Sequence, residues 1–188
     1  NYIGAKTDSI LVTVKDIEFL VGTAHATVAN TLTVKADPTY GDDWSDIVKK
    51  QTGVTITARV GAVTDTDQSH FTLRPTDKPS AGNETYELVY NGTINGTNYA
   101  NVVVVSGNVT VARKEVTVSG ITAADKVYDG NNSAMVNVST ATITGKKTGD
   151  DLTVSVAAGS TFDSADAGSR TVTLGTLTLG GTSAGNYT

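Results

Sequence analysis

An internal repeat with a spacing of 88 residues limits the folds that this chain can adopt. Tyr40-Gly41-Asp42 and Tyr128-Asp129-Gly130 lie at this spacing, and so do Asn98-Tyr99 and Asn186-Tyr187. Two independent markers at one spacing predict a single building block that is used twice. Such a block packs mainly on itself and on its neighbours, so the repeat favours small tandem modules over one large domain.

A second spacing predicts the module boundaries. Val12-Thr13-Val14 and Val109-Thr110-Val111 lie 97 residues apart, as do Asn1-Tyr2 and Asn98-Tyr99. We therefore predict that residues 1–15 are the closing strand of a preceding module, 16–112 a complete module and 113–188 a second one. The second module lacks a counterpart of residues 101–112, so we expect an exposed sheet edge with which the strand in 1–15 can pair. The junction at 112–115 is short and charged, which predicts stiff coupling.

Composition and periodicity predict an all-β, mostly antiparallel fold. Thr and Val are the two most frequent residues, and β-branched side chains fit a pleated sheet. Runs with a period of two predict strands at 31–36, 54–60, 70–73, 85–90, 102–111, 115–121, 136–143, 152–157 and 170–179. Both a sandwich and a β-grasp-like architecture fit this order of strands.

One short helix is predicted near residues 43–50. Either residue of Asp42-Asp43 can cap its start, and Lys49-Lys50 would close its last turn. Trp44 and Ile47 lie on one face, as expected of a helix that packs on a core.

The repeat markers suit turns that are anchored by an aromatic ring. Asp129-Gly130 favours a turn with positive φ, which glycine adopts at little cost. Tyr128 can bury its ring while its hydroxyl finds a partner, and Tyr187 offers the same combination. We therefore interpret both tyrosine motifs as structural elements that shape turns and fix strands.

Three blocks of the second module also resemble a known family. Lys126-Val127-Tyr128-Asp129-Gly130, Thr148-Gly149-Asp150-Asp151-Leu152 and Ala184-Gly185-Asn186-Tyr187 resemble, in this order, the YDG repeat of bacterial surface proteins. The first module resembles the related MBG-type repeats, apart from its helical insert at 44–50. The resemblance implies tandem modules of mostly β structure, an extracellular location on the bacterial cell surface or cell wall, and no catalytic residues.

Charge and motifs narrow the chemistry. A net charge of -5 and a pI near 4.9 argue against a nucleic-acid partner. No run approaches ~18 apolar residues, so we expect no membrane insertion. Neither His25 nor His70 lies in a recognisable nucleophile motif, and nucleotide-binding loops are absent, so we expect no enzyme and no cofactor. Alternate carboxylates make Asp163 and Asp166 weak calcium candidates, with turn formation as the other interpretation.

The function predicted from these observations is that of a repeat or stalk module of a bacterial cell-surface adhesin, with neighbouring repeats of the same chain as its partners. The alternative is a carbohydrate- or mucin-binding module of a secreted bacterial protein, with a host glycan or matrix protein as its ligand. Trp44, Tyr86 and Tyr90 are the candidate binding rings. Tyr86 and Tyr90 share a strand face with Leu88, which favours core packing for them instead.

Overall fold

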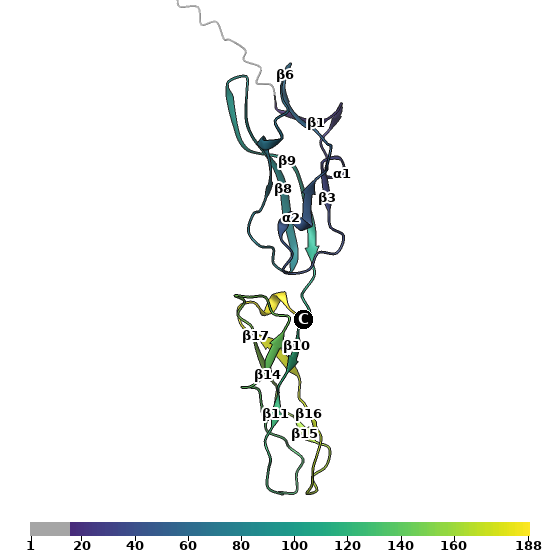
Figure 1. The fold of residues 1–188 in the computed structure, drawn as a ribbon, viewed down its shortest axis with the longest axis vertical. Coiled ribbons are helices and arrows are strands. Elements are labelled where there is room, and N and C mark those ends of the chain that lie inside the picture. Colours follow the sequence, from purple (N-terminus) through teal and green to yellow (C-terminus); the bar gives the residue numbers. More distant parts are fainter. Residues whose placement is uncertain (1–15) are drawn as a thin grey trace, which may run out of the picture. The chain divides into compact units, whose positions relative to one another are not determined.

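The computed structural model describes residues 16–188, which form two compact units (Figure 1). The described residues of the first unit are 16–33, 48–75 and 86–107. The second unit contains 34–47, 76–85 and 108–188. The predicted closing strand at residues 1–15 lies outside the described residues.

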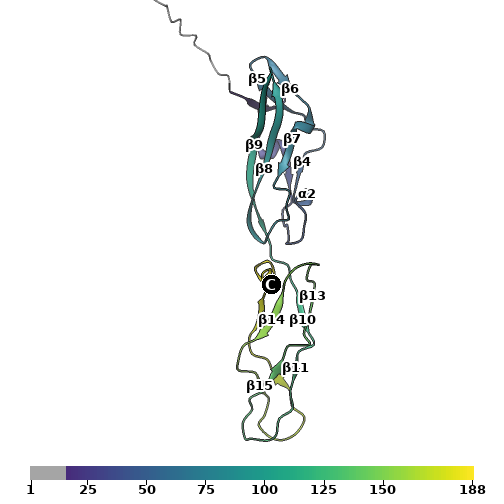
Figure 2. The ribbon, with the colours of Figure 1, turned by 90° about the vertical axis from the view of Figure 1, so that its left-hand side faces the viewer.

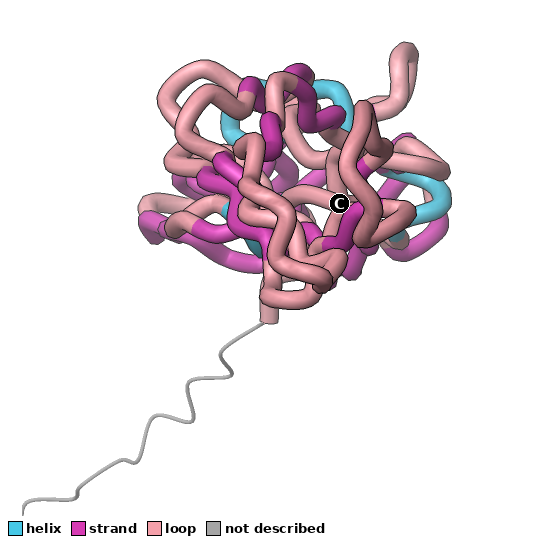
Figure 3. The backbone as a smooth tube through the Cα atoms, turned by 90° about the horizontal axis from the view of Figure 1, so that it is seen from below, coloured by secondary structure: helices cyan, strands magenta, loops and turns pink. Residues whose placement is uncertain are grey.

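The fold is all-β, as predicted, with strands that pair in antiparallel sheets. The strands between residues 16 and 111 are β1 (Glu18–Val21), β2 (Ala24–His25), β3 (Leu32–Val34), β4 (Val48–Lys50), β5 (Ile56–Val60), β6 (Val63–Asp65), β7 (Phe71–Arg74), β8 (Gly82–Ile94) and β9 (Thr97–Val111). The helical segments in this part are α1 (Val28–Thr31), α2 (Trp44–Ile47) and the 3-10 turn η1 (Gln68–His70). All of them are short, as the cyan segments in Figure 3 show.

Two sheets pack on each other in the first unit. One has the strand order β2-β1-β5-β6 and the other the order β7-β8-β9, with β8 and β9 side by side in both Figure 1 and Figure 2. Phe19 of β1 lies 6.3 Å from Phe71 of β7 and 5.7 Å from Tyr90 of β8, measured between ring centroids. Rings from both sheets therefore share one core, which is a sandwich arrangement. A helix of one turn is too short to cover a sheet as in a β-grasp fold.

The helix predicted near residues 43–50 is present, but it is only one turn long. The prediction that Lys49-Lys50 closes its last turn is wrong, because Val48–Lys50 is strand β4, which pairs with β3. The backbone N–H of Lys35 donates to the carbonyl oxygen of Ile47, so sheet pairing begins at the last helical residue. Trp44 and Ile47 are buried, as their shared face predicts. Tertiary pairing thus overrides the helical pattern beyond Ile47.

The strands after residue 112 are shorter and pair two by two. They are β10 (Thr117–Ser119), β11 (Thr122–Ala123), β12 (Val136–Asn137), β13 (Thr142–Thr144), β14 (Thr153–Val156), β15 (Thr161–Phe162), β16 (Val172–Thr173) and β17 (Leu177–Gly180), followed by the 3-10 turn η2 (Ala184–Asn186). The pairs are β10 with β13, β11 with β12, β14 with β17 and β15 with β16.

Close backbone approach explains why the strand predicted at 115–121 is split. Gly120 has φ +76°, and a Cβ atom there would lie 2.7 Å from the carbonyl oxygen of Thr140. The glycine therefore turns the chain between β10 and β11, where another residue would clash. The run predicted at 136–143 is also divided, into β12 and the first part of β13.

The two tyrosines of the 88-residue repeat lie in equivalent connections. Tyr40 lies between the paired strands β3 and β4, and Tyr128 lies between the paired strands β11 and β12. At the base of the first connection the N–H of Lys35 donates to Ile47, and at the base of the second the N–H of Ala124 donates to Met135. The two donor residues are 89 positions apart and the two acceptor residues are 88 positions apart. The repeat in the sequence is therefore also a repeat of strand pairing.

Candidate functional site

Ala112 and Lys114 form backbone hydrogen bonds with two different segments of the second unit. The N–H of Ala112 donates to the carbonyl oxygen of Pro38 over 2.8 Å, and the N–H of Tyr40 donates to the carbonyl oxygen of Ala112 over 2.8 Å. Lys114 then donates to Asn186 over 2.9 Å and accepts from Thr188 over 3.0 Å. The backbone N–H and C=O groups of Ala112 and of Lys114 are therefore all paired with partners in the second unit.

One carboxylate joins two of the three tyrosine markers in the second unit, Tyr40 and Tyr187. The hydroxyl of Tyr40 donates to Oδ2 of Asp150 over 2.9 Å, and the hydroxyl of Tyr187 donates to the same oxygen. The two rings meet edge to face, with centroids 5.3 Å apart. Tyr187 is 2% exposed, whereas Tyr40 is half-buried. Hydrogen bonds to a charged acceptor are stronger than neutral ones, so Asp150 is the centre of this cluster.

Further contacts surround the cluster. The backbone N–H of Lys147 donates to the hydroxyl oxygen of Tyr187 over 2.9 Å, and Nζ of Lys147 donates to the carbonyl oxygen of Gly41 over 3.0 Å. The N–H of Ala81 donates to Oδ1 of Asn186 over 2.9 Å. The segments 34–47 and 76–85 are thereby both bonded to residues 147–187.

Burial and the shared carboxylate keep both phenols protonated. Burial raises the pKa of Tyr40 and of Tyr187 above the usual value, and the hydrogen bond with Asp150 raises each pKa further. In the neighbouring turn, the Lys35 ammonium and the N–H of Thr39 bond to Asp42 and lower the pKa of its carboxyl. Asp42 therefore closes the turn before α2 instead of capping the helix. Gly41 in this turn has φ +96°, which favours glycine.

The comparison with protein families covers the part of the chain that holds Asp150 and Tyr187. Residues 112–188 match the family described as YDG domain. Residues 112–188 are a YDG domain. The match begins one residue before the boundary at 113 that the repeat predicts. No curated protein and no solved structure gives a significant match to the chain.

The tyrosine of the YDG motif itself is exposed, so the expectation that Tyr128 buries its ring is wrong. Its side chain is 66% exposed, and its hydroxyl has no hydrogen-bond partner among residues 16–188. Around it, Asp129 accepts from the N–H of Asn131 over 3.0 Å, and Gly130 has φ +75°, so the pair forms a turn. Lys126 bonds to Asp129 over 2.7 Å and lowers the pKa of its carboxyl.

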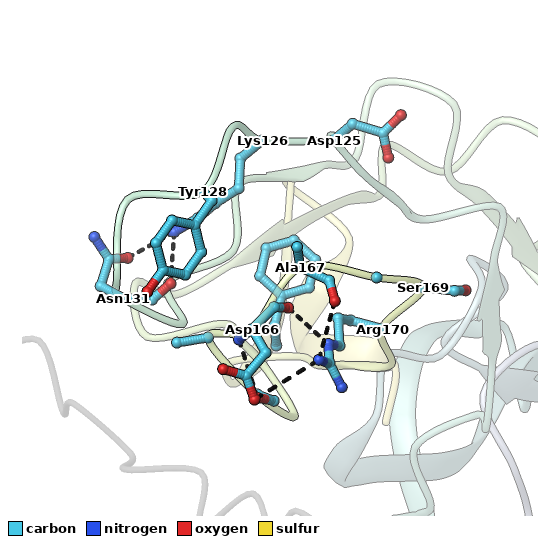
Figure 4. Close-up of a pocket in the computed structure, with 12 residues that line it drawn as sticks. Asp125, Lys126, Tyr128, Asn131, Asp166, Ala167, Ser169 and Arg170 are labelled. Carbon is cyan, nitrogen blue, oxygen red and sulfur yellow. Dashed lines mark hydrogen bonds and ion pairs between the residues drawn. The ribbon is translucent and has the colours of Figure 1, made fainter.

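A cavity of about 390 Å³ opens beside Tyr128 (Figure 4). It is lined by the turn around Tyr128, by Phe162 at the end of β15, and by residues 164–170 of the connection between β15 and β16. In that connection, Nε of Arg170 donates to the carbonyl oxygen of Asp166 over 2.9 Å. The sequence points to Tyr128 as a turn anchor and to Asp166 of this connection as a weak calcium candidate, but no local pattern indicates that the two line one cavity.

The rings considered for carbohydrate binding belong to the core. Trp44, Tyr86 and Tyr90 are 9%, 4% and 0% exposed. A sugar platform needs an exposed aromatic face, so these three side chains do not form one. Leu88, between the two tyrosines, is 0% exposed, in agreement with the core packing that the shared strand face favours.

The calcium candidates do not form a cluster of ligands. Oδ2 of Asp166 accepts from Ser164 over 3.0 Å and lies 3.9 Å from the guanidinium of Arg170. No group of three or more His, Cys, Asp or Glu side chains in the described part of the chain is arranged to hold a metal ion. No helix within residues 16–188 has the length and apolar character needed to span a bilayer.

The first unit contains a comparable cluster around the half-buried carboxylate of Asp65. Oδ2 of Asp65 accepts from the hydroxyl of Tyr90 over 2.6 Å and lies 2.6 Å from Nδ1 of His70. Burial raises the pKa of Asp65, but the bonds from Tyr90, the Asp67 backbone and His70 outweigh it and lower the pKa. Tyr99 packs on Tyr90 with ring centroids 6.4 Å apart. These contacts fix β6 to β8 within the core.

Proposed function

We propose that this chain is a stalk segment of a bacterial cell-surface adhesin, in which coupled β modules extend or present a binding region. The observation that carries the proposal is the cluster of Tyr40, Asp150 and Tyr187. It joins the connection between β3 and β4, which carries Tyr40, to the YDG domain within one compact unit. An array transmits extension only if its joints resist bending, and a joint with side-chain and backbone bonds meets this condition.

The family match supports the same proposal. Residues 112–188 belong to a domain type that the sequence resemblance links with tandem repeats in bacterial surface proteins. The 88-residue shift of strand pairing supports the interpretation of the preceding part as a related module. The partners are then neighbouring modules of the same chain, and the location is extracellular, on the cell surface or cell wall.

The stiffness of this joint can be measured by double electron–electron resonance between two spin labels. The chain has no Cys, so Lys78→Cys and Met135→Cys give two exposed labelling positions, both in the second unit. We expect one narrow distance distribution, which Tyr40→Ala broadens and Val127→Ala leaves unchanged. A broad distribution in the unmodified background contradicts the stalk role.

The location needs a separate test. Intact cells that naturally produce this chain are labelled with an antibody raised against residues 16–188. We expect labelling of intact cells at the level seen after lysis. Labelling that appears only after lysis contradicts a surface role.

A further inference from the structure

Two segments before residue 108 bind the YDG domain. The first is the connection between β3 and β4, which supplies the Tyr40 hydroxyl and the Gly41 carbonyl group. The second is the segment 76–85, which supplies the N–H of Ala81 to Asn186. Together they form a receptor surface for the end of the YDG domain that carries Asp150 and Tyr187.

Both segments have counterparts 88 residues later, and these counterparts lie together. Tyr128 corresponds to Tyr40, Asp129 to Gly41, and Ser169 to Ala81. Tyr128 and Ser169 both line the cavity of about 390 Å³, which lies between the turn after Lys126 and the connection from β15 to β16 (Figure 4). The surface that binds a YDG domain is thus repeated on the YDG domain itself.

One copy of the surface contacts the YDG domain, whereas the other copy is exposed. Tyr40 is half-buried, and its hydroxyl is bonded to Asp150. Tyr128 is 66% exposed, and among residues 16–188 its hydroxyl has no partner. Lys126 and Arg170 line the cavity, but each already bonds within its own connection. The groups left to recognise an incoming domain therefore include the Tyr128 ring, its hydroxyl and backbone N–H groups such as that of Ser169.

We propose that the cavity beside Tyr128 is the docking site for a second copy of the YDG domain. The Asp150 carboxylate of that second copy accepts from the Tyr128 hydroxyl, and its Asn186 side chain accepts from the N–H of Ser169. The proposal rests on the proposed function, because it supplies the joint by which an array of such modules continues.

The test uses a chain in which residues 101–188 are repeated after Thr188. Ala100 and Thr188 are equivalent in the 88-residue repeat, so the added segment continues the repeat in register. Hydrogen exchange is followed by mass spectrometry in peptides that cover 124–131 and 163–170 of the original domain. We expect exchange in both to slow by about tenfold relative to the 188-residue chain, the effect of one net hydrogen bond.

A pair of variants makes the test specific. Tyr128→Ala in the extended chain should abolish the protection. Val127→Ala should keep it, because Val127 is 89% exposed and does not line the cavity. Unchanged exchange in the extended chain, or equal effects of both variants, overturns the proposal. Protection of the same peptides in the original chain by galactosyl-N-acetylgalactosamine also overturns it, in favour of a glycan site.

A second measurement tests the proposal even if the added segment does not fold. Tyr40→Ala in the 188-residue chain frees the Asp150 end, so we expect self-association in sedimentation experiments that Tyr128→Ala removes. Absence of both protection and self-association overturns the proposal. Exchange in residues 36–43 of the original chain separates the two ideas. Suppose that the cavity stays unprotected in the extended chain. If Asp150→Ala then speeds exchange in residues 36–43, only the docking site is refuted. If Asp150→Ala leaves that exchange unchanged, the proposed joint is refuted as well.

Discussion

Replacement of Asp150 by alanine is the perturbation for which the structure makes the sharpest prediction. Oδ2 of Asp150 accepts from the hydroxyls of both Tyr40 and Tyr187. Without the carboxylate, both phenols lose their acceptor. Tyr187 keeps the N–H donated by Lys147, but that bond uses the hydroxyl oxygen and leaves the O–H unsatisfied.

The expected loss follows from the burial of the two tyrosines. A hydrogen bond to a charged group contributes about 1.5–3 kcal/mol. The bond from Tyr187 should have the upper part of this value, because its side chain is 2% exposed. Tyr40 is half-buried, so water can replace much of its bond. We therefore expect Asp150→Ala to reduce the free energy of unfolding of the second unit by about 3 kcal/mol.

The assay is urea unfolding followed by the fluorescence of Trp44. Trp44 is the one tryptophan of the chain, it is 9% exposed, and it belongs to the second unit. Asp163→Ala is the matched control, since that exposed carboxylate has no hydrogen bond within the described residues, and its effect should stay within about 0.5 kcal/mol. A loss below about 1 kcal/mol for Asp150→Ala would show that the two tyrosine–carboxylate bonds do not stabilise the second unit.

Two further predictions concern the titration of Tyr187 and the packing around Gly92. Burial, together with the bond to Asp150, raises the pKa of Tyr187 above 10.0, so its contribution is complete below pH 10.0 and is lost as the pH rises through the folded-state pKa. The urea midpoint should fall above about pH 10, and less steeply in Tyr187→Phe; equal slopes would contradict this. A Cβ atom at Gly92 would lie 2.3 Å from the Tyr90 hydroxyl, so Gly92→Ala should cost about 1–3 kcal/mol. Gly185→Ala is the control, with no atom within 4 Å of its Cβ position, and thermal unfolding that ranks the two equally would count against the packing argument.

The sequence predicts the long strands because their signal is local. The run at 102–111 lies within β9, and the run at 85–90 lies within β8. Alternating β-branched and aromatic residues favour strands wherever the chain pairs. The helix is predicted less well, because the extent of α2 depends on β3, with which Val48 must pair. Pairing with a distant partner is a tertiary effect that no local pattern carries.

The candidate site divides along the same line. The spacing of Tyr40 and Tyr128 predicts equivalent places, and the strand pairs on either side of them agree with this. The role of Asp150 could not be predicted, because Gly149-Asp150-Asp151 reads as a turn and nothing local distinguishes the first carboxylate from the second. The exposure of Tyr128 was also beyond the sequence. The equivalent tyrosines differ in exposure because residues 147–187 contact Tyr40, whereas no described segment covers Tyr128.

The energetic coupling between Tyr40 and Asp150 is the most direct test of whether the connection between β3 and β4 is bonded to the YDG domain. It is obtained from the unfolding free energies of Tyr40→Phe, Asp150→Ala, the double variant and the unmodified chain. We predict an interaction energy of about 1–2 kcal/mol, because the hydroxyl and the carboxylate contact each other directly. Effects that add within about 0.3 kcal/mol would show that the two groups do not interact, and the joint on which the stalk role rests would be absent.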